Sequence, residues 1–175
     1  VAAYHSASGG QTASAEEVWG RAVPYLISQS VENEEDSPDT YWRASISRTK
    51  LGRALIPLGI RVGDPQKLVV ARRSTSGRAM QLRVSGPDGA GEVAARALRS
   101  ALGEDVIRST LFEVRTSDDG FIFVGSGHGH GVGMSQWGAQ AMAKGGASYR
   151  EILAAFYPGA ELRRGREGGD EVSAR

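Results

Sequence analysis

The chain contains no cysteine among its 175 residues, so it can form neither a disulfide nor a thiolate metal site. No apolar run approaches the roughly 20 residues that a membrane-spanning helix needs. The formal net charge of +1 is too small to indicate nucleic acid or an anionic membrane as a partner. Lysine is scarce as well, since only three of the 21 basic residues are lysine, namely Lys50, Lys67 and Lys144, and the others are arginine. Either a GC-rich genome or planar recognition of carboxylates by arginine explains this bias, and we favour the genome explanation.

What is present is typical of one globular domain with a core. Hydrophobic residues make up 40 % of the chain and charged residues 23 %. The sequence opens on VAAYHSASGG without an initiator methionine and without a signal peptide. We expect a mature product from which an upstream part has been removed. The absence of cysteine fits an exported bacterial protein slightly better than a cytosolic one.

Helical and strand patterns alternate without a regular strand–helix–strand order, which predicts the α+β class with mostly antiparallel strands and a few short helices. Acidic, proline-bearing residues 32–40 predict an exposed loop. Trp19, Trp42 and Trp137 are each expected in a core. Strands are predicted at the start of 1–12, before a Ser/Gly loop, and at 41–47, 67–75, 77–86 and 109–127, the last with a DDG hairpin turn. Helices are predicted at 16–20, 91–103, 135–144 and 148–159, and 49–65 is predicted to be a short helix or irregular structure.

One segment departs from ordinary packing, because residues 125–133 carry a glycine at every second position. If this segment is extended, Ser126, His128, His130 and Val132 point to one face, and the other face has no side chains. Such a bare face predicts the close approach of another backbone or of a ligand.

All three histidines of the chain lie in two segments rich in glycine and serine, and three chemistries are open to them. His5, His128 and His130 could together hold zinc. Alternatively, a histidine could activate Ser6, Ser8 or Ser135 as the nucleophile of a hydrolase, although no G-x-S-x-G elbow is present. The third interpretation is a polar cleft for a sugar-rich ligand, with Trp137 as a stacking plane and hydrogen-bonding partners from Tyr4, the histidines, Ser135 and Gln136.

The stretch GHGHGVGMSQWGAQAMA, residues 127–143, closely resembles the signature of the stage II sporulation protein D (SpoIID)/LytB family, which includes amidase enhancers. YHSASGGQTASAEEVWGRAVPYL resembles the first block of that family, and SYREILAAFYPGAEL resembles its closing block. The resemblance runs from Tyr4 to about Leu162. It implies a SpoIID-like domain at 1–162 without its N-terminal block, followed by a disordered or appended tail at 163–175.

Sporulation members of this family are lytic transglycosylases of peptidoglycan, located outside the cytoplasm in the cell envelope or secreted. They cleave the MurNAc–GlcNAc bond without water, leave 1,6-anhydro-MurNAc ends, and act on strands from which an amidase has removed the stem peptides. The resemblance therefore implies glycan strands as substrate, with no cofactor and no metal. Further partners would be an N-acetylmuramoyl-L-alanine amidase, or an upstream segment present as a separate chain. A non-catalytic glycan-binding, amidase-enhancing module is the alternative.

The sequence departs from the family at the catalytic glutamate, which lies in an upstream Glu-x-Pro block that is absent here. We assign no catalytic residue, because no glutamate of this chain matches that position, including Glu16, Glu17, Glu92, Glu104, Glu113 and Glu151. By resemblance, the substrate-binding residues are Tyr4, His5, Ser6, Ser8, Gly9, Gly10, His128, His130, Ser135, Gln136 and Trp137.

Overall fold

The computed structural model describes residues 2–163, so nearly all of the tail expected at 163–175 lies outside the described residues. The chain is α+β, as predicted. Its strands are β1 (Tyr4–His5), β2 (Trp42–Ser47), β3 (Lys67–Arg73), β4 (Ala79–Gly86), β5 (Gly89–Ala94), β6 (Phe112–Ser117), β7 (Gly120–Gly125) and β8 (Met134–Ser135). Its helices are α1 (Ala15–Trp19), α2 (Arg48–Leu55), the 3₁₀ turn Ile56–Leu58, α3 (Ala95–Leu102), α4 (Gln136–Lys144) and α5 (Tyr149–Phe156).

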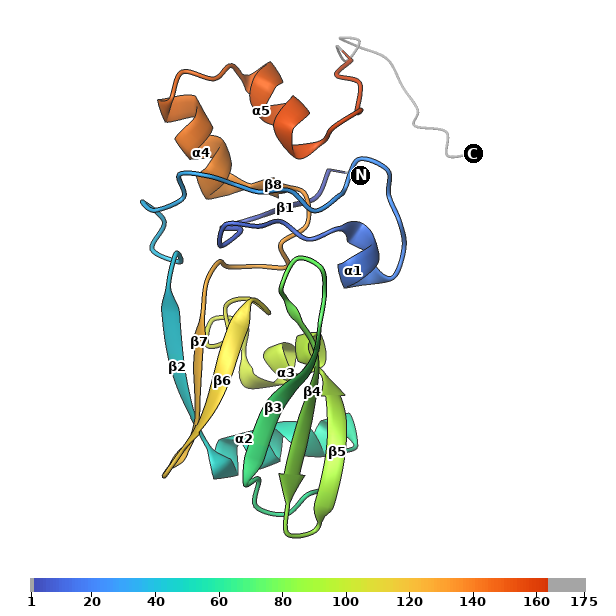
Figure 1. Cartoon of the computed structure of the whole chain (residues 1–175), viewed down its shortest axis with the longest axis vertical. Coiled ribbons are helices and arrows are strands. Elements are labelled where there is room, and N and C mark those ends of the chain that lie inside the picture. The colour runs from blue at the N-terminus through green and yellow to red at the C-terminus, as the bar shows by residue number, and fades with distance from the viewer. Residues whose placement is uncertain (1, 164–175) are drawn as a thin grey trace, which may run out of the picture.

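Two antiparallel sheets of three strands make up the lower half of the molecule as drawn in Figure 1. One sheet has the order β2-β7-β6 and the other β3-β4-β5, while α2 and α3 lie beside them. In the upper half, the short strands β1 and β8 pair in parallel, with Tyr4 opposite Met134. This pair joins the first segment of the chain to the segment that follows the glycine run.

Local sequence signals account for most of the helix ends. Capping boxes open α1 at Ser14 and α5 at Ser148, as their Ser-x-x-Glu spacing predicts. Ser135 caps α4 through the backbone N–H of Gly138. The helix predicted from residue 91 was placed too early, because residues up to Ala94 pair with β4 as strand β5. Cross-strand pairing therefore overrides the helical period there.

Buried hydrophobic side chains form two clusters rather than one. The lower cluster lies among the two sheets and includes Phe121, Phe123 and Leu82. The upper cluster packs α4 and α5 against the first segment and includes Leu26 and Phe156. Because the glycine run connects β7 to β8, it passes from one half of the molecule to the other (Figure 1).

Two burial predictions fail. The acidic loop 32–40 is not wholly exposed, since Glu34, Ser37 and Asp39 are buried among polar partners. Trp19 is not a core residue but is 43 % exposed, whereas Trp42 is buried as expected. Among the described residues, no helix has both the length and the apolar character to cross a bilayer.

Candidate functional site

The glycine run is not the extended strand that its alternation suggested. Gly127, Gly129, Gly131 and Gly133 have φ values of 76°, 105°, 83° and 73°, in the left-handed region that L side chains rarely adopt. Gly125 ends β7 and Met134–Ser135 form β8, but between them the run forms only isolated bridges at His128 and Val132. The alternation therefore encodes a repeated backbone conformation rather than a bare sheet face.

The predicted close approach is present, and the neighbour is the first segment of this same chain. A Cβ on Gly127 would lie 2.8 Å from the carbonyl oxygen of Ala7, and one on Gly133 would overlap the carbonyl oxygen of Ala3. Backbone hydrogen bonds join the same segments, from His128 N to Ala7 O (2.8 Å) and from Met134 N to Ala3 O (3.0 Å). The glycines let two backbones pack without intervening side chains.

Arg78 crosses from the lower half of the molecule into this junction. Its Nη2 donates to the carbonyl oxygens of Ser8 (2.9 Å) and Gln11 (3.0 Å), and the residue is 2 % exposed. Burial lowers the pKa of the guanidinium to about 10. A side chain on Gly131 would overlap this guanidinium, so the glycine leaves the space that Arg78 occupies.

Glu34 is the buried carboxylate that holds the two glycine-rich segments together. It accepts hydrogen bonds from Ser8 Oγ (2.6 Å), Ser8 N and Gly9 N (both 3.1 Å), and it also accepts from Ser135 Oγ. Burial acts to raise the pKa of Glu34, but the hydrogen bonds from Ser135 and Ser8 outweigh it and hold the pKa below its usual value. Glu34 is therefore an ionised structural anchor.

Two side chains predicted to bind substrate, those of Ser8 and Ser135, hydrogen-bond to this anchor. Ser8 and Ser135 are fully buried, and His5 is 5 % exposed. Because their side chains offer almost no surface to a ligand, we do not retain them in the proposed binding surface. Their position explains why the segments around Ser8 and Ser135 fold together.

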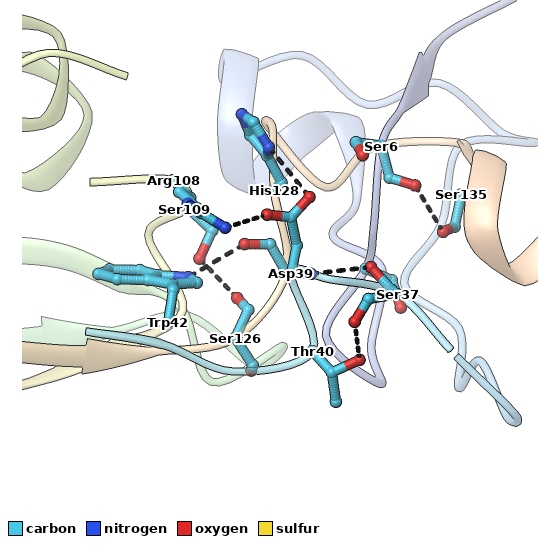
Figure 2. Close-up of polar contacts among 12 residues, drawn as sticks. Ser6, Ser37, Asp39, Thr40, Trp42, Arg108, Ser109, Ser126, His128 and Ser135 are labelled. Atoms are coloured by element: carbon cyan, nitrogen blue, oxygen red, sulfur yellow. Dashed lines mark hydrogen bonds and ion pairs between the residues drawn. The ribbon is translucent and has the colours of Figure 1, made fainter. Parts of the chain in front are cut away.

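A second polar cluster surrounds Asp39 (Figure 2). Its Oδ1 pairs with Arg108 Nη1 at 2.6 Å, and its Oδ2 lies 3.2 Å from His128 Nδ1. The carbonyl oxygen of Asp39 accepts from Gly127 N at 2.8 Å. Within the described part of the chain, no serine hydroxyl hydrogen-bonds to His128. The cluster thus has the base and the orienting carboxylate of a hydrolase but not its nucleophile.

His130 lies on another side of the run, beside His5 and Trp19. Its ring centre is 5.7 Å from that of His5 and 5.5 Å from that of Trp19. Its Nδ1 accepts the backbone N–H of Val132 at 3.0 Å, so the neutral ring carries its proton on Nε2. Burial lowers the pKa of His130, which favours this neutral form.

A cavity of about 400 Å³ opens next to His130, between the two halves of the molecule. Trp19 and Glu17 line it from α1, Arg96 and Arg99 from α3. Its size lies within the usual range of ligand-binding pockets. It combines an aromatic plane, a neutral imidazole and several guanidinium groups.

The remaining predicted site residues are distributed over other surfaces. Gly9 and Gly10 line a separate cavity of about 520 Å³ formed with the loop around Glu34. Tyr4 is exposed, and Trp137 is half-buried at the start of α4. The carbonyl oxygen of Ser6 accepts the backbone N–H of Trp137 at 3.0 Å, and Figure 2 shows Ser6 facing Ser135. Gln136 is exposed beside Trp137.

The three histidines do not converge on one point. His128 is bonded to Asp39, whereas His5 Nδ1 lies 3.2 Å from the carbonyl oxygen of Val132, to which it donates. Across residues 2–163, no three histidine, aspartate or glutamate side chains are grouped so as to hold a metal ion.

Residues 13–133 match the family described as a domain of unknown function, DUF8618. The chain belongs to this family. The match contains Glu34, Arg78 and the whole glycine run, whereas Ser8, Gly9 and Gln11, which Glu34 and Arg78 contact, lie before it.

Named relatives extend this assignment. The DUF8618 chain is 31 % identical over 170 residues to the stage II sporulation protein D of Bacillus subtilis, covering 92 % of this chain and 44 % of that protein. It is 28 % identical over 211 residues to the amidase enhancer of the same organism, covering 93 % and 29 %. An uncharacterized protein of Brachyspira hyodysenteriae is 33 % identical over 165 residues, covering 93 % and 43 %. The chain therefore spans less than half of these relatives, and the resemblance to the SpoIID/LytB family is confirmed.

Sequence reasoning missed three residues that organise this DUF8618 domain, namely Glu34, Asp39 and Arg78. The two acids lie in a loop whose charge and proline predict exposure, and Arg78 directly precedes β4 in a stretch with several other arginines. Their partners are 67 or more residues away in most cases, as for Arg78 with Gln11 and Glu34 with Ser135. Only the alternating glycines of residues 125–133 indicated that another group packs closely against this part of the chain.

His5 makes the stability of the DUF8618 domain depend on pH. Burial lowers the pKa of His5 from 6.5 to about 4, so the unfolded chain binds this proton more readily. Stability from His5 is therefore full above about pH 6.5 and falls as the pH drops toward 4, by about 3 kcal/mol in total. We expect His5→Asn to show a smaller loss than the wild type between about pH 7 and about pH 4.5 in urea unfolding. Equal losses in both proteins would contradict the neutral, buried histidine.

Proposed function

We propose that this domain binds the glycan strands of bacterial peptidoglycan in the cavity beside His130. The observation that carries the proposal is the composition of that cavity, where an exposed indole meets a neutral imidazole and arginines. Sugar rings stack on aromatic planes through their C–H faces, and their hydroxyls pair with planar polar groups. The names of the relatives, amidase enhancer and stage II sporulation protein D, support a role in the cell envelope. Its location would be outside the cytoplasm.

The reaction that we propose for the bound strand is lytic cleavage of the MurNAc–GlcNAc bond. A general acid protonates the glycosidic oxygen as it leaves with GlcNAc, and the 6-hydroxyl of MurNAc attacks the anomeric carbon in place of water. The carboxylate left by the acid then takes the proton of that hydroxyl. This acid needs a raised pKa near neutrality. The pKa values of Glu17 and Glu34 are lowered, because their hydrogen bonds outweigh burial, and that of Glu151 is lowered chiefly by Ser148. Because no glutamate of this chain matches the position of the family's catalytic glutamate, we assign the strand-binding role to this chain and the acid to the family's upstream segment.

A non-catalytic role as an amidase-enhancing module is the second candidate. It is favoured by the printed name of one relative, the amidase enhancer. Both functions require strand binding, and they differ in whether 1,6-anhydro ends appear. Mass spectrometry of glycans released from amidase-treated peptidoglycan separates them. A transglycosylase role requires anhydro ends once the family's upstream glutamate segment is supplied, and the enhancer role requires none.

The variant Trp19→Ala tests whether the domain binds glycan strands in this cavity. The indole is 43 % exposed on the cavity wall, so its removal costs little core packing. We expect the retention of amidase-treated strands in pull-down assays to fall about tenfold, while the melting temperature changes little. Tyr149→Ala, which removes an exposed aromatic ring on α5 remote from the cavity, is the matched control. Equal retention by the wild type and Trp19→Ala would contradict the assignment of this cavity.

A further inference from the structure

Glu17 contacts both halves of the molecule beside the cavity, each through a different carboxylate oxygen. Its Oε2 accepts the backbone N–H of Ser14 at 3.3 Å and so completes the capping box that opens α1. Its Oε1 accepts from Thr75 Oγ1 and from the backbone N–H of Ser76 (3.1 Å). Thr75 and Ser76 belong to the turn between β3 and β4, which reaches α1 in Figure 1. A capping box needs only the contact with Ser14, so the contact with the turn has a separate role.

Packing alone does little to fix the position of α1. Only Ala15 of its five residues is buried, and Val18 packs against the upper cluster while partly exposed. A helix of this length is marginal by itself, because its few internal hydrogen bonds do not offset the cost of ordering the backbone. Polar contacts with neighbouring elements therefore contribute strongly to the position of its last turn, which carries Trp19.

A second polar contact ties the end of α1 to the lower half. Arg96, on α3, donates from Nη1 to the carbonyl oxygen of Val18 at 3.1 Å. Trp19 follows Val18 in the chain, and its ring centre lies 5.5 Å from that of His130. Two adjacent residues of α1, Glu17 and Val18, thus contact two elements of the lower half, the β3–β4 turn and α3.

The carboxylate of Glu17 is ionised in this arrangement. Burial acts to raise its pKa, but hydrogen bonds from Thr75 and Ser76 outweigh burial and hold the pKa below its usual value. Hydrogen bonds to an ionised acceptor are about twice as strong as those between neutral groups. Loss of the Thr75 hydroxyl should therefore weaken the contact with the turn measurably, while the capping box on Oε2 stays intact.

We propose that Glu17 is a positioning residue, which clasps α1 to the β3–β4 turn and thereby holds Trp19 beside His130 on the cavity wall. We call the contacts of Glu17 Oε1 with Thr75 Oγ1 and Ser76 N the clasp. The inference rests on the proposed glycan-binding function for the use of the indole, because a ring that is already held in place loses less conformational freedom on binding. The clasp itself needs no ligand, so it can be measured in the free protein.

Hydrogen exchange in Thr75→Val tests whether the clasp exists. This substitution keeps the shape of an exposed side chain and removes its hydroxyl donor. The backbone N–H of Ser76 reports the clasp directly, since its acceptor is Glu17 Oε1. We expect exchange at this amide, corrected for the intrinsic rate of each sequence, to become about tenfold faster in Thr75→Val. The amide of Leu82, buried in the central strand β4, should keep its wild-type rate, which distinguishes local opening from global unfolding.

Fluorine NMR of protein labelled with 5-fluorotryptophan reads the surroundings of the indole, and Trp19→Phe assigns its resonance. Thr75→Val should shift the Trp19 resonance and lower the retention of amidase-treated strands about threefold. Thr75→Ser keeps a hydroxyl, so it should restore the wild-type resonance, exchange rate and retention. Thr116→Val is the matched control, because Thr116 is an exposed threonine of β6 outside the cavity lining, and it should change none of these values.

Wild-type exchange at Ser76 together with an unshifted Trp19 resonance in Thr75→Val would overturn the inference. Equal acceleration at Ser76 and Leu82 would overturn it too, because the contact would then serve overall stability alone. An opened clasp with unchanged strand retention would contradict the positioning role. If the wild type retains no strands, the proposed function fails, whereas the exchange and fluorine measurements still decide whether Glu17 holds Trp19 in place.

Discussion

Glu34→Ala is expected to destabilise the protein by about 3 kcal/mol or more, enough to unfold a marginally stable domain. Glu34 receives hydrogen bonds from Ser8, Gly9 and Ser135 inside the junction. Alanine leaves the donors of Ser8 and Gly9 without this acceptor and leaves Ser135 Oγ only its 3.4 Å contact with the carbonyl oxygen of Ser6. Glu34 also contributes favourably to the charge on buried Arg78, which would lose that compensation. Urea unfolding followed by circular dichroism measures the change. Glu35→Ala, an exposed neighbour, should change the free energy of unfolding by less than about 0.5 kcal/mol.

The same carboxylate predicts how the protein responds to acid. Hydrogen bonds keep the pKa of Glu34 below its usual value of 4.5, so this stabilisation is present above that pH and is lost as the pH falls through the folded-state value. His5 acts earlier, in the interval between about 6.5 and 4. Glu34→Gln keeps the shape but presents an amide to N–H donors, so it should also be destabilised and should show less acid dependence. A variant as stable as the wild type at neutral pH would contradict the anchoring role.

Local chemistry explains which parts of the fold could be predicted. The capping boxes at Ser14 and Ser148 need partners only three residues away, and the hairpin before Gly120 needs a short turn. Such signals lie within one stretch of sequence. The alternation in β2 likewise predicted which side chains are buried, because one face of this strand packs on the lower cluster.

The site could be predicted only in part, because its contacts join residues that are distant in the sequence. The glycine run predicted a close approach, but the partner that occupies the space, such as Arg78 beside Gly131, comes from a segment distant in the sequence. A charged side chain in an acidic loop predicts exposure unless distant donors compensate its burial, as they do for Glu34. Trp19 was expected in a core, yet it lines the cavity together with Glu17 and Val18 of the same short helix.

The separation of the two halves also bears on function. The lower and upper clusters each bury their own side chains, and the polar junction between them carries Glu34, Asp39 and the glycine run. The cavity proposed to bind glycan lies at this junction, with walls from both halves. Any change that loosens the junction should therefore affect binding as well as stability. Substitution of the glycines of the run measures how strongly the junction contributes to stability.

Gly133→Ala is expected to cost about 3 kcal/mol or more and to reduce the yield of soluble protein. Its φ of 73° strains any L side chain, and the added Cβ would also overlap the carbonyl oxygen of Ala3, which cannot move without breaking the β1–β8 pairing. Gly129→Val and Gly131→Val should be at least as damaging, since they drive a larger side chain into His5 and Arg78. Thermal melts and urea unfolding of the purified variants measure these losses.

Gly146→Ala separates backbone strain from close approach. Gly146 has a similar left-handed φ of 91°, but a Cβ there would meet nothing within 4 Å. It should therefore cost only about 1 kcal/mol, the strain of the conformation itself. If Gly133→Ala and Gly146→Ala lose the same amount, the glycines of the run serve only their backbone conformation. If Gly133→Ala loses several times more, the close contact of the two segments holds the junction together, and the cavity between the halves depends on it.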